Sequence, residues 1–145
     1  MRIPDTLLIA CCPFAGRLSA ERVAAAIGRG VRAAGRPAPD VCAFARARAG
    51  RELEAELAEL GFDARLREAR ALVVTAWGLR RETLRESVAF ELATRARQAG
   101  VPAYGIGGSW QLDDFDARVL DLQVVLAAGE ERELRAAGRK LASIA

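Results

Sequence analysis

Apolar residues occur along the chain in two alternating patterns. Five short runs are almost continuously apolar, which is typical of strands buried on both faces of a sheet. The stretches between them place apolar residues every three or four positions, which is typical of amphipathic helices. The predicted strands are 6–12, 40–44, 71–76, 102–106 and 122–128. The predicted helices are 19–34, 50–60, a short one capped by Asp63, 83–98, 113–120 and 130–143.

Capping residues set the predicted ends of these helices. Ser19 is placed to cap the first helix, and Gly35 lies just beyond its end. The sequence from Thr83 to Glu86 fits a capping box, so the longest central helix is expected to begin there and to end at Gly100.

Strands that alternate with helices predict a parallel sheet with helices on both faces, because each connection must cross over the sheet. The expected fold is therefore α/β: a three-layer sandwich, Rossmann-like or flavodoxin-like, with a mostly parallel sheet of about five strands. Segments 71–76 and 102–106 should be central neighbours of 6–12. The length of 145 residues suits a single α/β domain that spans 1–145.

Composition excludes several kinds of chemistry. The chain contains no histidine, which rules out His-based catalytic triads and most zinc sites. Its three cysteines, two of them adjacent, do not make a disulfide framework, so a reducing cytoplasm is the expected location. The short apolar run near the N-terminus is interpreted as an internal strand rather than a signal peptide. No run approaches the roughly 20 apolar residues that a membrane span requires.

The charged residues point to solvated helix faces. The net charge is +3, and every basic residue except Lys140 is an arginine. The arginines lie among glutamates along the predicted helices, a pattern typical of exposed faces with i,i+4 ion pairs. We therefore expect neither a nucleic-acid partner nor a membrane partner.

Four loops follow the predicted strands and should converge at the carboxyl edge of the sheet, where open α/β sheets bind ligands. Their sequences are CCPFAG, FARARAG, AWGLRRET and IGGSWQLDD. The ligand-binding candidates within them are Cys11, Cys12, Phe14, Gly16, Thr75, Gly78, Arg80, Arg81, Gly107, Gly108 and Ser109.

Several of these loop residues have a structural alternative that we favour. Arg80 and Arg81 match phosphate geometry, but we favour the interpretation that they solvate the approach to the next helix. The glycine-rich segment 105–109 is either a tight turn or an anion site made of backbone N–H groups. Three acidic residues nearby favour a helix start over a metal site. They are Asp113, Asp114 and Asp116.

The adjacent cysteines allow two interpretations. In the favoured one, one of Cys11 and Cys12 packs as a small apolar side chain and the other lines the pocket. In the alternative, the helix that begins at Ser19 lowers the pKa of one thiol and makes it reactive. No metal site is expected from the cysteines.

Three stretches of the chain, in order, resemble the two-domain bacterial glycerate kinases. LLIACCPFAGRLSAERVAAAIGRGVR is similar to the opening strand of that family, its Asp-Ser-Phe-Lys-Gly-Ser-Leu-Ser-Ala motif and its first helix. The motif residues matched as they stand are Phe14, Gly16, Leu18, Ser19 and Ala20. GFDARLREARALVVTAWG resembles the segment that leads into the family's Thr-Gly-Glu-Gly loop, and AGVPAYGIGGS resembles the strand that follows.

The chain departs from the family at polar motif positions. Cys12 stands where the motif has aspartate, and Ala15 where it has lysine. Ala76 and Trp77 replace the Gly-Glu of the Thr-Gly-Glu-Gly loop. Between residues 44 and 50 the chain also lacks the long middle portion that builds the second domain of the family.

The resemblance implies a single glycerate kinase-like lobe. The family activity is ATP-dependent phosphorylation of glycerate, and ATP and Mg²⁺ are implied only if that activity is retained. Because of the replaced residues, we expect the isolated chain to be inactive and assign no catalytic residue. The alternatives are a non-catalytic module for small-ligand binding or dimerisation, and one subunit of a split kinase. The expected partners are a small acidic ligand and either a second copy or a separately encoded domain.

Aromatic residues at the strand ends suggest a contact surface. Trp77, Trp110, Phe14 and the bridge near Phe44 are expected to form an exposed apolar edge that a homodimer covers. Alternatively, both tryptophans fold inward over the core of the same lobe, which would leave a monomer.

Overall fold

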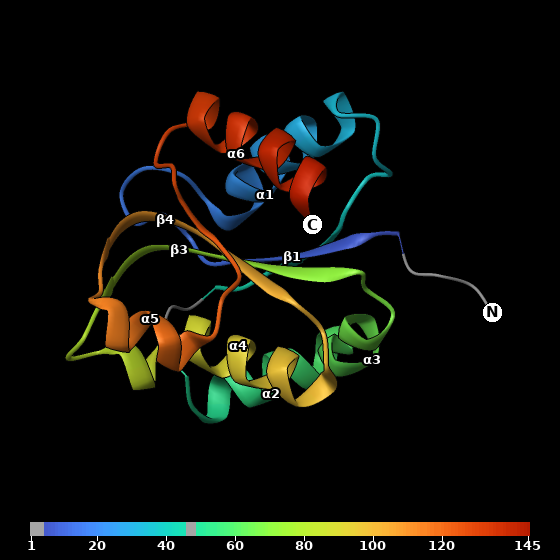
Figure 1. Ribbon diagram of the computed structural model, residues 1–145. Coiled ribbons are helices and arrows are strands. Elements are labelled where there is room, and N and C mark those ends of the chain that lie inside the picture. The colour runs from blue at the N-terminus through green and yellow to red at the C-terminus, as the bar shows by residue number, and fades with distance from the viewer. Residues whose placement is uncertain (1–4, 46–48) are drawn as a thin grey trace.

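Five parallel strands form one central sheet in the computed structural model, which describes residues 5–45 and 49–145 (Figure 1). The order of the strands across the sheet is β2-β1-β3-β4-β5, and every neighbouring pair is parallel. The strands are β1 Leu7–Cys11, β2 Asp40–Ala43, β3 Ala71–Arg80, β4 Ala103–Gln111 and β5 Val125–Ala127. All five predicted strands are present, and β1, β3 and β4 are central neighbours as predicted.

Helices cover both faces of the sheet (Figure 1). On one face lie α1 Ala20–Ala33 and α6 Glu131–Ile144. On the other lie α2 Arg51–Leu60, α3 Phe62–Arg67, α4 Val88–Ala99 and α5 Asp114–Leu120. Alternate residues of each strand enter different cores: Leu8 and Val74 contribute to the α2–α5 side, whereas Ile9 and Val73 contribute to the α1/α6 side.

The strand order identifies the fold as flavodoxin-like. The chain first moves outward from β1 to β2, then crosses back so that β3 and the later strands extend on the other side of β1. The connections from β1 and from β3 therefore diverge and leave a crevice at the carboxyl ends of these two strands. The predicted α/β sandwich is confirmed, and the crevice fixes where a ligand site is expected.

Two predicted loops begin as strand. β3 continues to Arg80 and β4 to Gln111, because Gly78, Leu79 and Arg80 keep pairing with β4 past the buried part of the sheet. The extended ends curve away from the sheet together (Figure 1). The prediction of a glycine-rich turn at 105–109 was therefore wrong, since these residues lie within β4. Part of the FARARAG loop, residues 46–48, lies outside the described residues.

Two predicted helix starts also differ from the structure. Residues Leu84–Glu86 form a separate 3₁₀ turn, and α4 begins after Ser87 rather than at Thr83. The Ser87 hydroxyl accepts a hydrogen bond from the Phe90 N–H at 3.1 Å and donates one to the Leu84 carbonyl at 2.6 Å. The predicted cap of α3 was wrong as well, because Asp63 lies inside that helix.

Helices α1 and α6 touch through their backbones at two glycines. A Cβ atom added at Gly30 would lie 1.9 Å from the Arg135 carbonyl oxygen, and one added at Gly138 would lie 2.1 Å from the Ile27 carbonyl oxygen. Real side chains never approach a carbonyl oxygen so closely, so the two helices can pack at this distance because both positions lack a Cβ atom.

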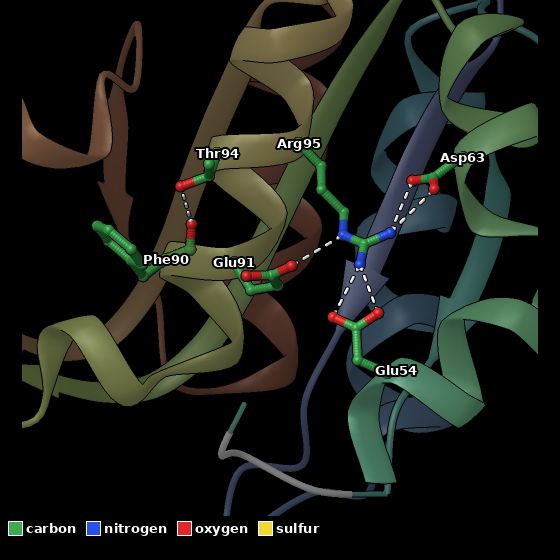
Figure 2. A network of polar contacts seen from close by, with 6 residues as sticks. All are labelled: Glu54, Asp63, Phe90, Glu91, Thr94 and Arg95. Atoms are coloured by element: carbon green, nitrogen blue, oxygen red, sulfur yellow. Dashed lines mark hydrogen bonds and ion pairs between the residues drawn. The ribbon is translucent and has the colours of Figure 1, made fainter. Parts of the chain in front are cut away.

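On the opposite face, Arg95 joins three helices (Figure 2). Its guanidinium donates to both carboxylate oxygens of Asp63 on α3 at 2.9 and 3.0 Å and to both of Glu54 on α2 at 2.9 and 3.0 Å. Its Nε donates to Glu91 on α4 at 3.0 Å, which is an i,i+4 pair of the predicted kind. The Arg95 side chain is 18% exposed, whereas Glu54 and Asp63 are 60% and 56% exposed, so the guanidinium is largely buried and these two carboxylates reach it from the solvent side.

Arg95→Met is expected to lower the free energy of unfolding by about 1–2 kcal/mol, because three carboxylates would then face one another without a cation. Urea unfolding at low and high NaCl measures the effect, and added salt should reduce the deficit because it screens the remaining repulsion. Glu54→Gln is the matched control and should cost less, since Arg95 keeps two carboxylate partners. A deficit that does not change with salt would contradict this explanation.

Candidate functional site

A cavity of about 430 Å³ opens at the carboxyl ends of β1, β3 and β4, beside the N-terminus of α4. This is the crevice at which the strand order reverses, where ligands of open α/β sheets bind. The residues that line it are Cys12, Pro13, Ala15, Ala76, Trp77, Gly78, Leu79, Arg80, Thr83, Glu86, Ser87, Ala89, Ser109 and Gln111. We call it the switch-point cavity.

Four of the predicted ligand-binding residues line this cavity, and seven do not. Those that do are Cys12, Gly78, Arg80 and Ser109. Cys11, Phe14 and Thr75 are fully buried, and Cys11 and Phe14 belong to the core beneath α1 and α6. The remaining candidates outside the cavity lining are Gly16, Arg81, Gly107 and Gly108.

Several polar residues of the cavity were not predicted from the sequence. Thr83, Ser87 and Gln111 add hydroxyl and amide groups to the lining, and Glu86 adds a carboxylate. The available signal was Ser87, because a serine three residues before Phe90 fits the N-cap of a helix as well as Thr83 does. With the helix start moved to Ser87, the 3₁₀ turn before it faces the strand ends.

Both adjacent thiols are buried and resist ionisation. Burial raises the pKa of Cys11 to about 12, and burial together with the nearby Glu56 carboxylate raises the pKa of Cys12 to about 12. Thiols with such pKa values are almost entirely protonated at neutral pH and are poor nucleophiles. The structural interpretation is therefore favoured over the reactive one: Cys11 packs in the core, and Cys12 lines the cavity.

Trp77 lies against glycine backbone on the α1/α6 side of the sheet. A Cβ atom added at Gly108 would lie 2.0 Å from the Trp77 ring. Phe14 meets the ring edge-on at a centroid distance of 5.5 Å, and the Arg17 guanidinium lies 4.1 Å from the ring centroid. Trp77 is thus held on the surface of its own lobe, with one face covered by glycine backbone.

Trp110 folds back over the other side of the sheet. Its indole N–H donates to the Ala76 carbonyl at 3.0 Å, and a Cβ atom added at Gly107 would lie 2.3 Å from its ring. Both tryptophans are therefore partly buried. This is the alternative arrangement given above, in which both tryptophans fold inward over the core of their own lobe. The prediction of an exposed aromatic edge was wrong for Phe14, which is buried, and the predicted bridge near Phe44 lies in part outside the described residues.

The acidic cluster near α5 acts in helix capping. The Asp113 carboxylate accepts a hydrogen bond from the Asp116 N–H at 2.9 Å, and backbone hydrogen bonds of this kind lower the pKa of Asp113. Within residues 5–45 and 49–145, no three cysteine or acidic side chains gather in a way that could hold a metal ion. The helix-start interpretation accounts for this cluster.

The switch-point cavity offers hydrogen bonds from hydroxyls and an amide, one guanidinium and one carboxylate around an apolar floor. Cavities of this composition bind small polar molecules and orient them through a few directed hydrogen bonds. The cavity contains one thiol, that of Cys12, which is protonated at neutral pH and is therefore a poor nucleophile. Its geometry suits binding better than covalent catalysis.

Comparison with known proteins gives the fold and no family. The sequence matches no family model and no curated protein. A response regulator receiver domain from Rhodospirillum rubrum is similar in structure, with a TM-score of 0.53 and 16% identity over 96% of this chain and 92% of that one. A protein from Burkholderia pseudomallei described as pilus assembly-related gives a TM-score of 0.51 and 17% identity over 99% and 94% of the two chains.

A protein from Salmonella typhimurium described as glycerate kinase 2 is also similar, with 17% identity. The match has a TM-score of 0.47 and covers 73% of this chain but 27% of that one, so it carries no argument about function. At these identities the likenesses support the flavodoxin-like fold alone. In the described part of the chain, no helix combines the length and the apolar character that crossing a bilayer requires.

Proposed function

We propose that this chain is a glycerate kinase-like lobe that binds a small polar ligand in the switch-point cavity without phosphorylating it. One observation carries the proposal. The four residues that depart from the family motifs, Cys12, Ala15, Ala76 and Trp77, all line this one cavity, and all but Ala76 stand where the motifs have a polar side chain. Positions far apart in the sequence that differ from the family motifs thus meet at a single place.

Phosphoryl transfer requires cations that neutralise developing charge and carboxylates that hold Mg²⁺. Where the family motifs have aspartate, lysine and glutamate, this cavity has a protonated thiol, a methyl group and a tryptophan whose ring packs against Phe14 and Gly108. Arg80 and Glu86 remain among the lining residues, but one residue of each charge makes a poor phosphoryl-transfer site. These replacements support binding without catalysis.

The lining residues indicate what the ligand offers in return. Ser109 and Thr83 carry hydroxyls that can donate or accept, and Gln111 carries an amide that does both. The Ser87 hydroxyl already donates its hydrogen to the Leu84 carbonyl and caps α4, so toward a ligand it can act as an acceptor only. Arg80 favours a carboxylate or another anionic group at one end of the ligand. A small hydroxylated acid fits this set, and the volume of about 430 Å³ suffices for such a molecule.

The purified chain is expected to show no glycerate-dependent ADP release above background. Each lost contact to developing charge costs roughly 3 kcal/mol of transition-state stabilisation, so losing several removes many orders of magnitude in rate. A coupled assay with an active bacterial glycerate kinase in parallel measures this. Turnover by this chain that disappears in Ser109→Trp would overturn the non-catalytic part of the proposal.

Ligand binding is tested by a thermal-shift screen of glycerate, other small hydroxy acids and adenine nucleotides. A ligand at 100 times its Kd adds about 2.7 kcal/mol of stability, which raises the Tm by several degrees. Ser109 is exposed and lines the cavity, so Ser109→Trp should abolish the shift without disturbing the core. Ser143→Trp, an exposed serine on α6, is the matched control and should leave the shift intact. A shift that persists in Ser109→Trp would contradict this site.

The second candidate function is that of one subunit of a split kinase. The stretches that resemble the family leave out the middle portion, which builds the family's second domain, and a separately encoded protein would supply that domain. In that case a protein resembling the missing domain should co-purify with this chain and restore turnover. A homodimer is less favoured, since Trp77 and Trp110 pack on their own lobe. Sedimentation at micromolar concentration distinguishes a monomer from a dimer.

A further inference from the structure

Positive charge accumulates on one helical layer of the molecule. The α1/α6 side, residues 17–36 and 129–145, carries nine basic and four acidic side chains. The α2–α5 side, residues 50–70 and 80–121, carries ten basic and thirteen acidic side chains. The two faces of the sheet are therefore covered by layers of opposite net charge (Figure 1).

In the described residues, one ion pair joins an acidic residue of the α1/α6 layer to one of its arginines, that of Glu131 with Arg22. The sequence predicted i,i+4 pairs along α6, but Glu131 pairs with Arg22 of α1 instead of with Arg135. The Glu133 carboxylate accepts hydrogen bonds from the backbone N–H groups of Gly129 and Glu130, both at 3.1 Å, as a helix cap. Its charge is thus directed to the start of α6, away from the later turns of the helix.

Six cations on these two helices are exposed and form no ion pair within the described residues. They are Arg29, Arg32, Arg132, Arg135, Arg139 and Lys140, which we call the basic ridge. The other layer also carries exposed arginines outside the ion pairs, but there acidic side chains outnumber basic ones, and carboxylates engage Arg95 and Arg65. Like charges gathered without counter-charges repel one another, and an anionic partner would relieve that repulsion.

The glycine contact brings the backbones of basic residues from both helices close together. A Cβ atom added at Gly30 would lie 1.9 Å from the Arg135 carbonyl oxygen and 2.8 Å from the Arg139 backbone nitrogen. Arg29 directly precedes this contact, so its backbone and those of Arg135 and Arg139 lie within one helical turn of the crossing point. The packed helices hold these arginines on a rigid support.

The residues between the cations favour a helical protein partner over a membrane or a single-stranded nucleic acid. The exposed positions there include Ala25, Ala33 and Ala136, whose small side chains allow another helix to approach closely. Among the described residues, Ile144 is the one large apolar side chain exposed on α1 or α6, so apolar anchors for lipid and aromatic platforms for bases are both missing.

We propose that the basic ridge is a docking surface for an acidic helix of another protein. Arginine donates two parallel hydrogen bonds to a carboxylate, so glutamates spaced along one face of a helix suit the unpaired guanidiniums. The acidic α2–α5 layer on the far side of the sheet orients an approaching acidic partner toward the ridge. This surface is separate from the switch-point cavity and does not depend on the function proposed for it.

A fluorescent helical peptide of about 20 residues, made of Glu-Ala-Ala-Ala repeats, is the probe. Anisotropy should report binding that weakens as NaCl rises from about 50 to about 300 mM, and the peptide with glutamine in place of glutamate should not bind. The triple variant Arg29→Glu, Arg135→Glu, Arg139→Glu should weaken binding at least about ten-fold. The control variant Arg51→Glu, Arg67→Glu, Arg97→Glu has the same net charge on the opposite layer and should weaken it less than about three-fold.

Four results would overturn the proposal. One is no measurable binding of the acidic peptide, and another is equal weakening by the two triple variants. A third is tighter ridge-dependent binding of duplex DNA or of phosphatidylserine vesicles than of the peptide, which would assign the ridge to a nucleic acid or a membrane. The fourth is salt-dependent self-association in sedimentation that the ridge variant removes, which would make a second copy the occupant. Urea unfolding confirms beforehand that both variants are folded.

Discussion

Gly30→Ala is expected to lower the free energy of unfolding by about 2 kcal/mol, since the added methyl group overpacks the contact between α1 and α6. The new Cβ atom would lie 1.9 Å from the Arg135 carbonyl oxygen, and backbone atoms cannot rotate aside as a flexible side chain can. The helices must therefore separate, which loosens the apolar packing along their whole interface. Urea unfolding followed by circular dichroism measures the loss.

Gly28→Ala is the matched control, because Gly28 is also buried and lies two residues earlier in the same helix. The nearest atom to its added Cβ would be Pro39 Cγ at 3.6 Å, an ordinary contact. Replacing a helix-interior glycine by alanine without a clash should raise the free energy of unfolding by about 0.5–1 kcal/mol. Opposite signs at the two glycines are the expected result, and equal effects would contradict the close packing of α1 and α6.

The fold could be predicted from the sequence because the apolar runs, the helix caps and the alternation of strands and helices all indicate the same arrangement. Continuous apolar runs such as 71–76 are fully buried in the sheet, and Ser19 caps α1 by accepting a hydrogen bond from the Arg22 N–H. Parallel strands joined by helices allow few arrangements, so the neighbours of β1 followed from the alternation of elements. These features depend on local sequence and on general rules of chain connection.

The candidate site could be predicted less completely, because contacts between distant residues extend the strands that form it. Glycines and polar residues after 76 and 106 indicate loops locally, yet the packing of Trp110 on Gly107 keeps β3 and β4 paired to their ends. Ser109 and Gln111 reach the cavity on this extension. The sequence alone does not show that an indole folds back over a glycine three residues earlier.

Ion pairing was predicted least well. Spacing along a helix identifies which charges can meet, but Glu131 is drawn to Arg22 of another helix and Glu133 to the backbone at the start of α6. Which charges pair therefore depends on how the helices cross. For α1 and α6, the crossing requires the close backbone contacts at Gly30 and Gly138. The basic ridge is therefore a property of the folded molecule rather than of the helical pattern.

Alkaline pH is expected to destabilise the protein steeply, in part through its buried thiols. Burial raises the pKa of Cys11 from 9.0 to about 12, so between these values the thiol stays protonated in the folded chain and ionises in the unfolded chain. The unfolded state then binds fewer protons, so the free energy of unfolding falls by about 1.4 kcal/mol per pH unit for each such thiol. Cys12, with a pKa also raised to about 12, contributes in the same direction.

Cys11→Ala isolates the contribution of one thiol. Below pH 9 the variant is expected to be somewhat less stable than the parent, because it loses a buried sulfur atom. Between pH 9 and about 11 its stability should fall less steeply, by about 1.4 kcal/mol per pH unit, so that the two urea-unfolding curves converge and then cross. Val73→Ala, a buried apolar truncation in the same core, is the matched control and should stay parallel to the parent at every pH. If Cys11→Ala also stayed parallel, the thiol would ionise equally in both states, and its interpretation as a buried, inert core residue would be wrong.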